Sequence, residues 1–143
     1  MNISRIFRWG LGAIALFALI QAFPMSRTNP PVLGDLAAPA EVKAILKASC
    51  YDCHSNETVW LWYTKVAPAS WLIAHDVSDG RRRFNFSDWN SYGPDRQAAI
   101  KSRAIREIKR GEMPPWYYTI KHPDAKLTAD KQALLEAWAT SPR

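Results

Sequence analysis

The sequence predicts an all-α domain with long loops, and three observations support this fold class. Apolar residues recur at helical spacing in three segments, and no strand-rich alternation or internal repeat is present. Prolines and glycines separate these segments, so the loops between them are long. The chain has 143 residues, which is enough for one domain with its own core. Long ordered loops in so small a domain indicate that they wrap around a bound group.

The first 24 residues have the pattern of an export signal or a membrane anchor. Arg5 and Arg8 precede an apolar run at residues 9–23, in which Gln21 is the only polar side chain. A positive start before an apolar run directs export, and the positive end stays in the cytoplasm. No small-x-small cleavage site follows the run, which predicts an uncleaved helix that crosses the membrane once. A cleaved signal is the alternative.

Residues 25–38 are predicted to form a proline-rich tether, and residues 39–143 the folded domain. Pro30, Pro31 and Gly34 prevent a regular element in the tether. With either form of the N-terminal segment, the tether and the domain are expected outside the cytoplasmic membrane. In a bacterium this is the periplasmic side of the inner membrane.

Three amphipathic helices are predicted within the domain. Pro39 suits the first turn of the first helix, which runs to about residue 50. Pro94 begins the second helix, and Gly111 ends it as a left-handed cap. Thr128 is a good N-cap for the third. The residues expected along the apolar faces are Val42, Ile45, Leu46, Ala98, Ile105, Ile108, Leu134, Leu135 and Trp138.

Residues 55–93 lack a clean period and are rich in aromatic side chains. A short helix is expected from Pro68, and residues 80–94 are expected to form a loop with short turns. Seven tryptophans are many for this length. They predict either an aromatic-rich core or a large flat apolar group against which the aromatic rings pack.

The only two cysteines belong to the pentapeptide Cys-Tyr-Asp-Cys-His, which ends at His54. A disulfide between Cys50 and Cys53 would close a very small loop and stabilise the chain little. A redox dithiol is found in a βαβ context, which this sequence lacks. A zinc site would require His75 or His122 as a further ligand, and the adjacent Cys53 and His54 point in different directions. The pattern Cys-x-x-Cys-His is the signature of c-type haem attachment.

The spacing of this signature has a physical reason. Residues i and i+3 of one helical turn point the same way and lie about 5–6 Å apart. Cys50 and Cys53 can therefore each form a thioether with one vinyl group on the same haem edge, and His54 can bind the iron as proximal ligand. The sequence thus predicts one covalently attached haem c.

Met113 is the expected second iron ligand. Of the three methionines, Met1 is the initiator and Met25 lies in the tether. Two prolines follow Met113 and stiffen its loop, and a thioether ligand favours ferrous haem and raises its potential. His75 is the rival ligand, and bis-histidine ligation would lower the potential. His122 has the sequence context of a loop histidine.

The net charge of +6 does not indicate a nucleic-acid-binding protein, because no zinc-finger, RNP or basic-zipper pattern is present. The basic residues form either a solvated face or a docking surface for an acidic partner or anionic lipid. They include Arg81, Arg82, Arg83, Arg96, Lys101, Arg103, Arg106, Lys109 and Arg110.

Four blocks of the sequence resemble the bacterial haem-binding domain family, a group of small membrane-tethered c-type haem proteins. They are CYDCHSNETVWLWY, APASWLIAHDVSDGRRRFNFSDW, GEMPPWYY and HPDAKLTADKQALLEAW, and together they span about residues 29–138. The resemblance implies a cytochrome-c-like helical fold around one haem c, with residues 39–143 as the haem c-binding domain. It implies Cys50, Cys53 and His54 as attachment and proximal residues, and Met113 as the distal ligand.

The resemblance also implies roles for the aromatic middle of the chain. The side chains that it places near the haem, or in the core beside it, are Trp60, Trp62, Tyr63 and Trp71. It further suggests that one of the arginines at 81–83, or Asn85, reaches the haem propionates. A solvated surface is the alternative for the arginines.

These observations predict an electron carrier with six-coordinate iron rather than an enzyme, because a saturated iron has no site for substrate. The carrier would dock transiently with a redox partner protein that the sequence does not identify, and its N-terminal helix would attach it to the membrane. Two alternatives remain. One is a haem-based enzyme or gas sensor with a labile distal ligand. The other is a structural or assembly subunit whose haem only stabilises the fold.

Overall fold

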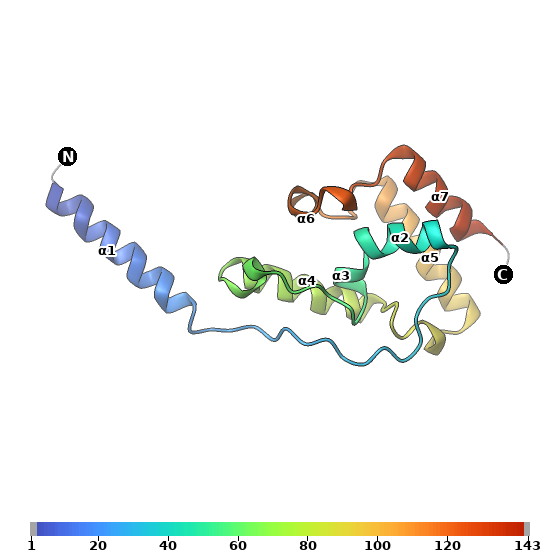
Figure 1. Ribbon diagram of the computed structural model, residues 1–143, viewed down its shortest axis with the longest axis horizontal. Coiled ribbons are helices and arrows are strands. Elements are labelled where there is room, and N and C mark those ends of the chain that lie inside the picture. The colour runs from blue at the N-terminus through green and yellow to red at the C-terminus, as the bar shows by residue number, and fades with distance from the viewer. Residues whose placement is uncertain (1–2, 142–143) are drawn as a thin grey trace.

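The computed structural model describes residues 3–141, and within this range the chain is all-α, as the sequence predicts (Figure 1). No strand is present in this range, and its one β-bridge is the isolated pair of Gly34 and Asp88. The α-helices are α1 (Ile3–Ile20), α2 (Ala40–Ser49), α3 (Tyr51–His54), α4 (Ala69–Arg83), α5 (Pro94–Lys109), α6 (Trp116–Lys121) and α7 (Ala129–Thr140). The 3₁₀ helices are η1 (Trp62–Lys65), η2 (Trp89–Ser91) and η3 (Pro123–Ala125).

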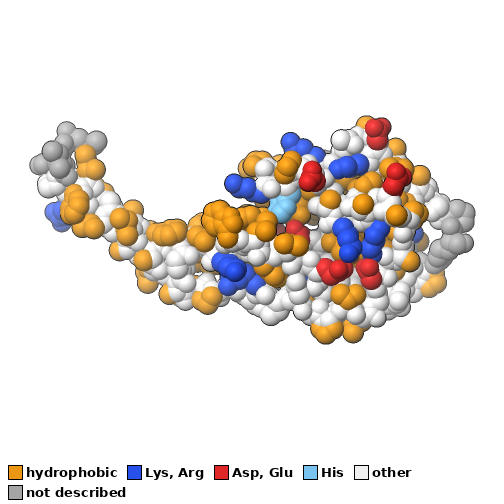
Figure 2. Space-filling view, viewed as in Figure 1, with side chains coloured by type: hydrophobic (Ala, Val, Ile, Leu, Met, Phe, Trp, Pro, Cys, Tyr) orange, Lys and Arg blue, Asp and Glu red, His pale blue; other side chains and the backbone are white. Residues whose placement is uncertain are grey.

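Helix α1 stands apart from the domain, and an extended segment joins the two (Figure 1). Figure 2 shows apolar side chains exposed along its length. The turn after α1 is nevertheless fixed to the domain. The Gln21 side chain donates to the Ala67 carbonyl at 3.3 Å and accepts from the Ala67 N–H at 2.9 Å. The Trp71 indole donates to the Phe23 carbonyl at 3.0 Å.

No helix in the described part of the chain is long and apolar enough to cross a membrane, so the expected single-pass membrane helix is not supported. Helix α1 has 18 residues, and Arg5 and Arg8 lie in its first two turns. A spanning helix needs about 20 predominantly apolar residues. The apolar run predicted at residues 9–23 is divided by the end of the helix at Ile20.

The three amphipathic helices predicted for the domain are present as α2, α5 and α7. Helix α2 begins directly after Pro39. Gly111 lies just beyond α5 with a φ of 74°, which is the left-handed conformation that its sequence position predicts. Thr128 caps α7, because its hydroxyl accepts a hydrogen bond from the Lys131 N–H at 3.4 Å.

Two details differ from the sequence-based prediction. Helix α4 continues through Gly80 to Arg83, where a loop was expected. Arginine is a good helix former, and tertiary packing against α3 offsets the helix-breaking tendency of the glycine. In α5 no residue is buried, and Ala98 is exposed rather than directed to the core. This helix borders a cavity, as described below, and packs against the core only in part, through Ile100, Ile105 and Ile108.

The core lies where α2, α3, α7 and the segment after α4 meet. Helix α2 packs against α7, and α5 lies beside α7 (Figure 1). The buried cluster comprises Leu36, Val42, Ile45, Leu46, Tyr51, Phe86, Trp89 and Leu135. The aromatic side chains of this core come from the middle of the sequence, as its composition indicates.

Residues 28–36, from the segment predicted as a tether, lie along the domain and are called the strap below. The backbone N–H groups of Leu33 and Gly34 both donate to the Ser87 carbonyl, at 2.9 and 2.8 Å. The Asn56 side chain donates to the Pro31 carbonyl at 2.8 Å. The strap is therefore held by hydrogen bonds along its length and forms part of the folded domain.

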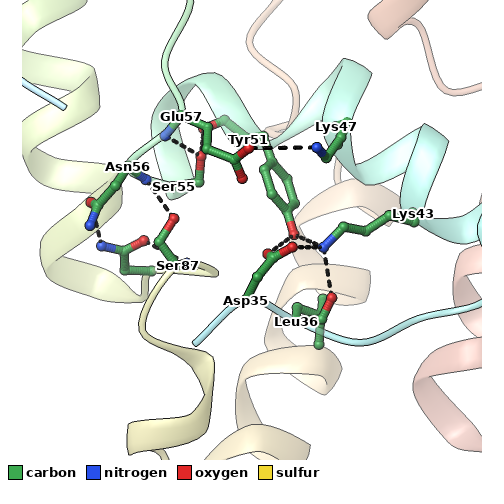
Figure 3. Close-up of polar contacts among 10 residues, drawn as sticks. Asp35, Leu36, Lys43, Lys47, Tyr51, Ser55, Asn56, Glu57 and Ser87 are labelled. Atoms are coloured by element: carbon green, nitrogen blue, oxygen red, sulfur yellow. Dashed lines mark hydrogen bonds and ion pairs between the residues drawn. The ribbon is translucent and has the colours of Figure 1, made fainter. Parts of the chain in front are cut away.

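The end of the strap belongs to a polar cluster around Tyr51 (Figure 3). The Tyr51 hydroxyl donates to the Asp35 carboxylate at 2.7 Å, and Lys43 forms an ion pair with the same carboxylate. Just beyond α3, the Asn56 N–H donates to the Ser87 hydroxyl at 2.8 Å (Figure 3). These contacts fix the face of α3 that points to the strap.

Candidate cofactor site

A cavity of about 610 Å³ lies beside α3, and residues from α2 to α7 line it. This volume is within the range of ~300–1,000 Å³ that is common for ligand and cofactor pockets. Cys50, Cys53, His54 and Met113 all line this one cavity. The fold thus brings together the four residues that the sequence singled out.

The cysteine motif faces the cavity because α2 ends at Ser49 and the separate turn α3 follows. The Cys50 carbonyl accepts hydrogen bonds from the N–H groups of Cys53, at 3.2 Å, and His54, at 2.9 Å. These bonds close one helical turn, so Cys50 and Cys53 lie on the same side of the chain. Both thiols are free, and no disulfide joins them.

His54 is buried, with 8% of its surface exposed. Its Nδ1 lies 3.0 Å from the Gly80 carbonyl oxygen and 3.4 Å from that of Phe84. Carbonyl groups only accept hydrogen bonds, so Nδ1 carries the proton and Nε2 keeps a free lone pair. Burial lowers the pKa of the imidazole, which keeps it neutral. The Phe84 ring stacks on the imidazole with ring centroids 4.0 Å apart. His54 is therefore fixed in orientation, neutral and protonated at Nδ1, as a metal-binding histidine is.

Gly80 allows α4 to approach the cysteine motif closely. A Cβ atom at this position would lie 2.4 Å from the Cys53 carbonyl oxygen, which no side chain tolerates. The same glycine supplies the carbonyl that orients His54. Sequence reasoning missed Gly80, although a glycine within a helical run often has a packing reason.

The alternatives to cofactor attachment have no support in this geometry. Burial raises the pKa of the Cys50 and Cys53 thiols to about 12, whereas a redox dithiol depends on a lowered thiol pKa. No group of three His, Cys, Asp or Glu side chains in the described part of the chain could hold a metal. His75 is exposed on α4, and His122 Nε2 is hydrogen-bonded to the Tyr63 hydroxyl at 2.7 Å.

Met113 reaches the cavity from the loop between α5 and α6. Its side chain is 40% exposed, so it borders both the cavity and the solvent. Pro114 and Pro115 line the same side of the cavity. His75 is not among the lining residues. Of the two candidate second ligands, Met113 is therefore the one that the geometry favours.

The aromatic lining of the cavity differs from the expectation. Trp62 is 75% exposed, and the Trp60 indole donates to the Asn29 side chain in the strap at 3.1 Å. The four residues expected near the haem do not line this cavity: Trp60, Trp62, Tyr63 and Trp71. The indole N–H groups of Trp60 and Trp71 instead find acceptors in the N-terminal segment. The aromatic residues that line the cavity are Phe84, Phe86, Trp89, Tyr117, Tyr118 and Trp138.

One of the arginines at 81–83, or Asn85, was expected to reach the haem propionates, and of these residues Arg81 and Asn85 stabilise the strap side instead. The Arg81 guanidinium donates to the carbonyls of Ser55 and Thr28, both at 2.8 Å, and to two side chains. Asn85 is buried, and its side chain donates to Asn56 at 2.8 Å. Of the three consecutive arginines, only that at position 83 lines the cavity.

A family model described as a haem-binding domain matches residues 15–141. The chain belongs to the haem-binding domain family. The match covers the whole cavity and most of the described chain, and it supports haem as the cofactor of this haem-binding domain. No curated protein and no solved structure matches the chain.

The residues of the cavity fit a haem. The apolar walls suit the face of a porphyrin, and the neutral His54 imidazole with its free Nε2 suits the iron. Arg83, Arg96 and Arg103 also line the cavity and are suitable partners for the two carboxylates of a haem. The donor set of this haem-binding domain is therefore consistent with its family.

Proposed function

We propose that the protein is a monohaem c-type cytochrome that transfers electrons. In this proposal Cys50 and Cys53 hold the haem covalently, and His54 and Met113 are the axial iron ligands. One observation carries the proposal: these four residues line a single cavity whose other walls are largely apolar. The expected cytochrome-c-like arrangement of helices around the haem is part of the same proposal.

Cys50 and Cys53 would hold the cofactor by simple addition. Each S–H would add across one vinyl double bond, with a new S–C bond and the hydrogen on the neighbouring carbon, so no oxidant would be needed. The free state of both thiols is the one that this addition requires. His54 is held for its role by the Gly80 carbonyl and the Phe84 ring.

Electron transfer fits this ligand set better than catalysis does. A bound haem supplies a reversible one-electron change at its iron, and a thioether ligand favours the ferrous state. If His54 and Met113 both bind the iron, no position on the iron would remain for a substrate. The partial exposure of Met113 brings this side of the cavity to the surface, where a redox partner protein would dock.

The proposed location is the periplasmic side of a bacterial inner membrane. The basic residues Arg5 and Arg8 before an apolar run are typical of an export signal. Cell fractionation, followed by N-terminal sequencing of the purified protein, tests this location. Protein found in the cytoplasmic fraction with residues 1–24 still attached would contradict it.

A haem-based gas sensor or enzyme is a second candidate, and the exposure of Met113 favours it. A ligand that is 40% exposed, on a loop between two helices without buried residues, could be displaced by a small molecule. In that case the reduced protein would bind carbon monoxide rapidly in its wild-type form, whereas an electron carrier would bind it slowly.

The decisive experiment compares three variants of the full chain. Cys50→Ala with Cys53→Ala should give no haem-stained band on a denaturing gel, and a stained band would contradict covalent attachment. Met113→Ala should lose the weak red absorption band of sulfur-ligated ferric haem, and its potential should fall. His75→Ala is the matched control and should keep the wild-type spectrum. The reverse result would make His75 the ligand.

A further inference from the structure

Helix α6 follows directly after Met113 and its two prolines, but burial does not hold it in place. No residue of α6 is buried. Its apolar side chains Trp116 and Ile120 are 73% and 63% exposed. Other interactions must therefore set the position of α6 and of the loop that carries Met113.

Two consecutive tyrosines of α6 form these interactions. The Tyr117 hydroxyl donates to the Asp76 carboxylate on α4 at 2.8 Å. The Tyr118 hydroxyl donates to the Asp52 carboxylate on α3, also at 2.8 Å. Consecutive side chains on a helix point about 100° apart, so the two bonds together restrain both the position and the rotation of α6.

The electrostatics of the two phenols keep them as donors. Burial and the Asp76 carboxylate raise the pKa of Tyr117 to about 12. Burial and the Asp52 carboxylate raise the pKa of Tyr118 as well. Both hydroxyls are therefore protonated at neutral pH, and hydrogen bonds to a carboxylate are stronger than those between neutral groups.

A third contact holds the other end of α6. The His122 ring stacks on the Tyr118 ring with centroids 4.1 Å apart. His122 Nε2 is hydrogen-bonded to the hydroxyl of Tyr63 in η1 at 2.7 Å. In Figure 1, α6 lies above α4, and these contacts join the end of α6 to η1, which precedes α4.

We infer that Tyr117 and Tyr118 are positioning residues that hold Met113 at the haem iron. Asp52 lies between the two cysteines of the motif, and Asp76 lies one turn before Gly80, whose carbonyl orients His54. The two tyrosines therefore tie the loop of the second ligand directly to the elements that hold the first. This inference rests on the proposed function, because it takes Met113 as an iron ligand.

The test measures how easily an added ligand replaces Met113. Imidazole is titrated into the oxidised holoprotein, and binding is followed by loss of the red absorption band. Tyr117→Phe with Tyr118→Phe removes both hydroxyls and keeps both rings. Because imidazole binds only when Met113 is displaced, its affinity should rise about 10- to 100-fold for the double variant. Hydrogen exchange should become faster in residues 116–121.

Tyr51→Phe is the matched control, because it removes the same kind of bond from the strap side. The Tyr51 hydroxyl donates to Asp35 at 2.7 Å (Figure 3). This variant should lower stability without changing imidazole affinity. A second control, Asp76→Asn, keeps an oxygen acceptor for Tyr117 and should change imidazole affinity less than Asp76→Ala does.

The outcomes separate the inference from the proposed function. If the double variant keeps the wild-type imidazole affinity and the wild-type exchange in α6, the role of the tyrosines is overturned and the ligand assignment stands. If Tyr51→Phe raises the affinity equally, general loosening explains the effect and the inference is also overturned. If the wild-type protein lacks the red band that Met113→Ala should remove, the ligand assignment fails and the inference fails with it.

Discussion

The two sides of the cysteine motif are stabilised in different ways. On the strap side, Ser87 is fully buried and hydrogen-bonds Asn56, which in turn bonds Asn85. Every buried side-chain nitrogen or oxygen in the described part of the chain has a hydrogen-bond partner. On the cavity side, α5 and α6 have no buried residue at all. The strap side is thus a network of hydrogen-bonded polar groups, and the cavity side is a largely apolar wall around the cavity.

This difference indicates a division of tasks. A buried polar network holds one geometry, because any displacement leaves an unpaired polar group. The strap side can therefore hold Cys50, Cys53 and His54 in place before a cofactor binds. The cavity side is less tightly packed, because no residue of α5 or α6 is buried, so haem binding should provide much of its stability.

Loss of the haem should produce the largest difference between the two sides. In Cys50→Ala with Cys53→Ala, prepared without haem, we expect amide exchange in α5 and α6 to accelerate by at least about 100-fold, because the cavity that both helices border would then be empty. The strap amides of Leu33 and Gly34 should remain protected. Equal loss of protection on both sides would contradict the division of tasks.

Gly80→Ala should disturb the strap side most among single substitutions. The added methyl group would lie 2.4 Å from the Cys53 carbonyl oxygen, so α3 and α4 must move apart. Overpacking of this kind costs about 1–3 kcal/mol of unfolding free energy. Thermal or denaturant unfolding measures the loss. Gly93→Ala is the control, because nothing lies within 4 Å of its added methyl group, and it should change stability little.

Arg81→Met should release the strap from α3. It removes hydrogen bonds to the Ser55 and Thr28 carbonyls while keeping a long apolar stem. We expect a loss of about 2 kcal/mol and faster proteolysis in residues 28–36, because hydrogen bonds from a charged donor are the stronger ones. Arg82→Met removes only an exposed ion pair with Asp79 and should be nearly neutral. Equal proteolysis of the two variants would show that Arg81 does not anchor the strap.

The smallest effect is expected at Trp62. Its side chain is 75% exposed and does not line the cavity. Trp62→Ser should therefore leave the haem absorption spectrum unchanged. Phe84→Leu provides the contrast, since Phe84 stacks on His54 and lines the cavity, and its spectrum should shift. A spectral change in Trp62→Ser would restore the sequence-based expectation that this tryptophan contacts the haem.

Sequence reasoning was most successful where the determinants are local. The helices after Pro39, Pro94 and Thr128 were predicted from neighbouring residues, and so was the left-handed Gly111. The turn of the cysteine motif is equally local, because it spans five residues. These features depend on backbone preferences and spacing that operate within one or two turns of the chain.

The errors arose where distant segments meet. The tryptophans at the start of the aromatic region were expected near the haem or in the core beside it, yet the indoles of Trp60 and Trp71 donate to the N-terminal segment. Composition indicates that aromatic side chains need neighbours, but it does not say which ones. The membrane helix, by contrast, was predicted from a local run of residue types, and it is not supported because no helix in residues 3–141 is long and apolar enough to span a membrane.

The sequence by itself determined the local turn that brings the two cysteines and His54 together, because one short spacing places them on a single turn. Only the tertiary structure decided how that turn is held. The bonds from His54 to Gly80, from Tyr117 to Asp76 and from Tyr118 to Asp52 join residues 26, 41 and 66 positions apart. No local preference encodes such pairs, since each depends on how whole helices pack around the cavity.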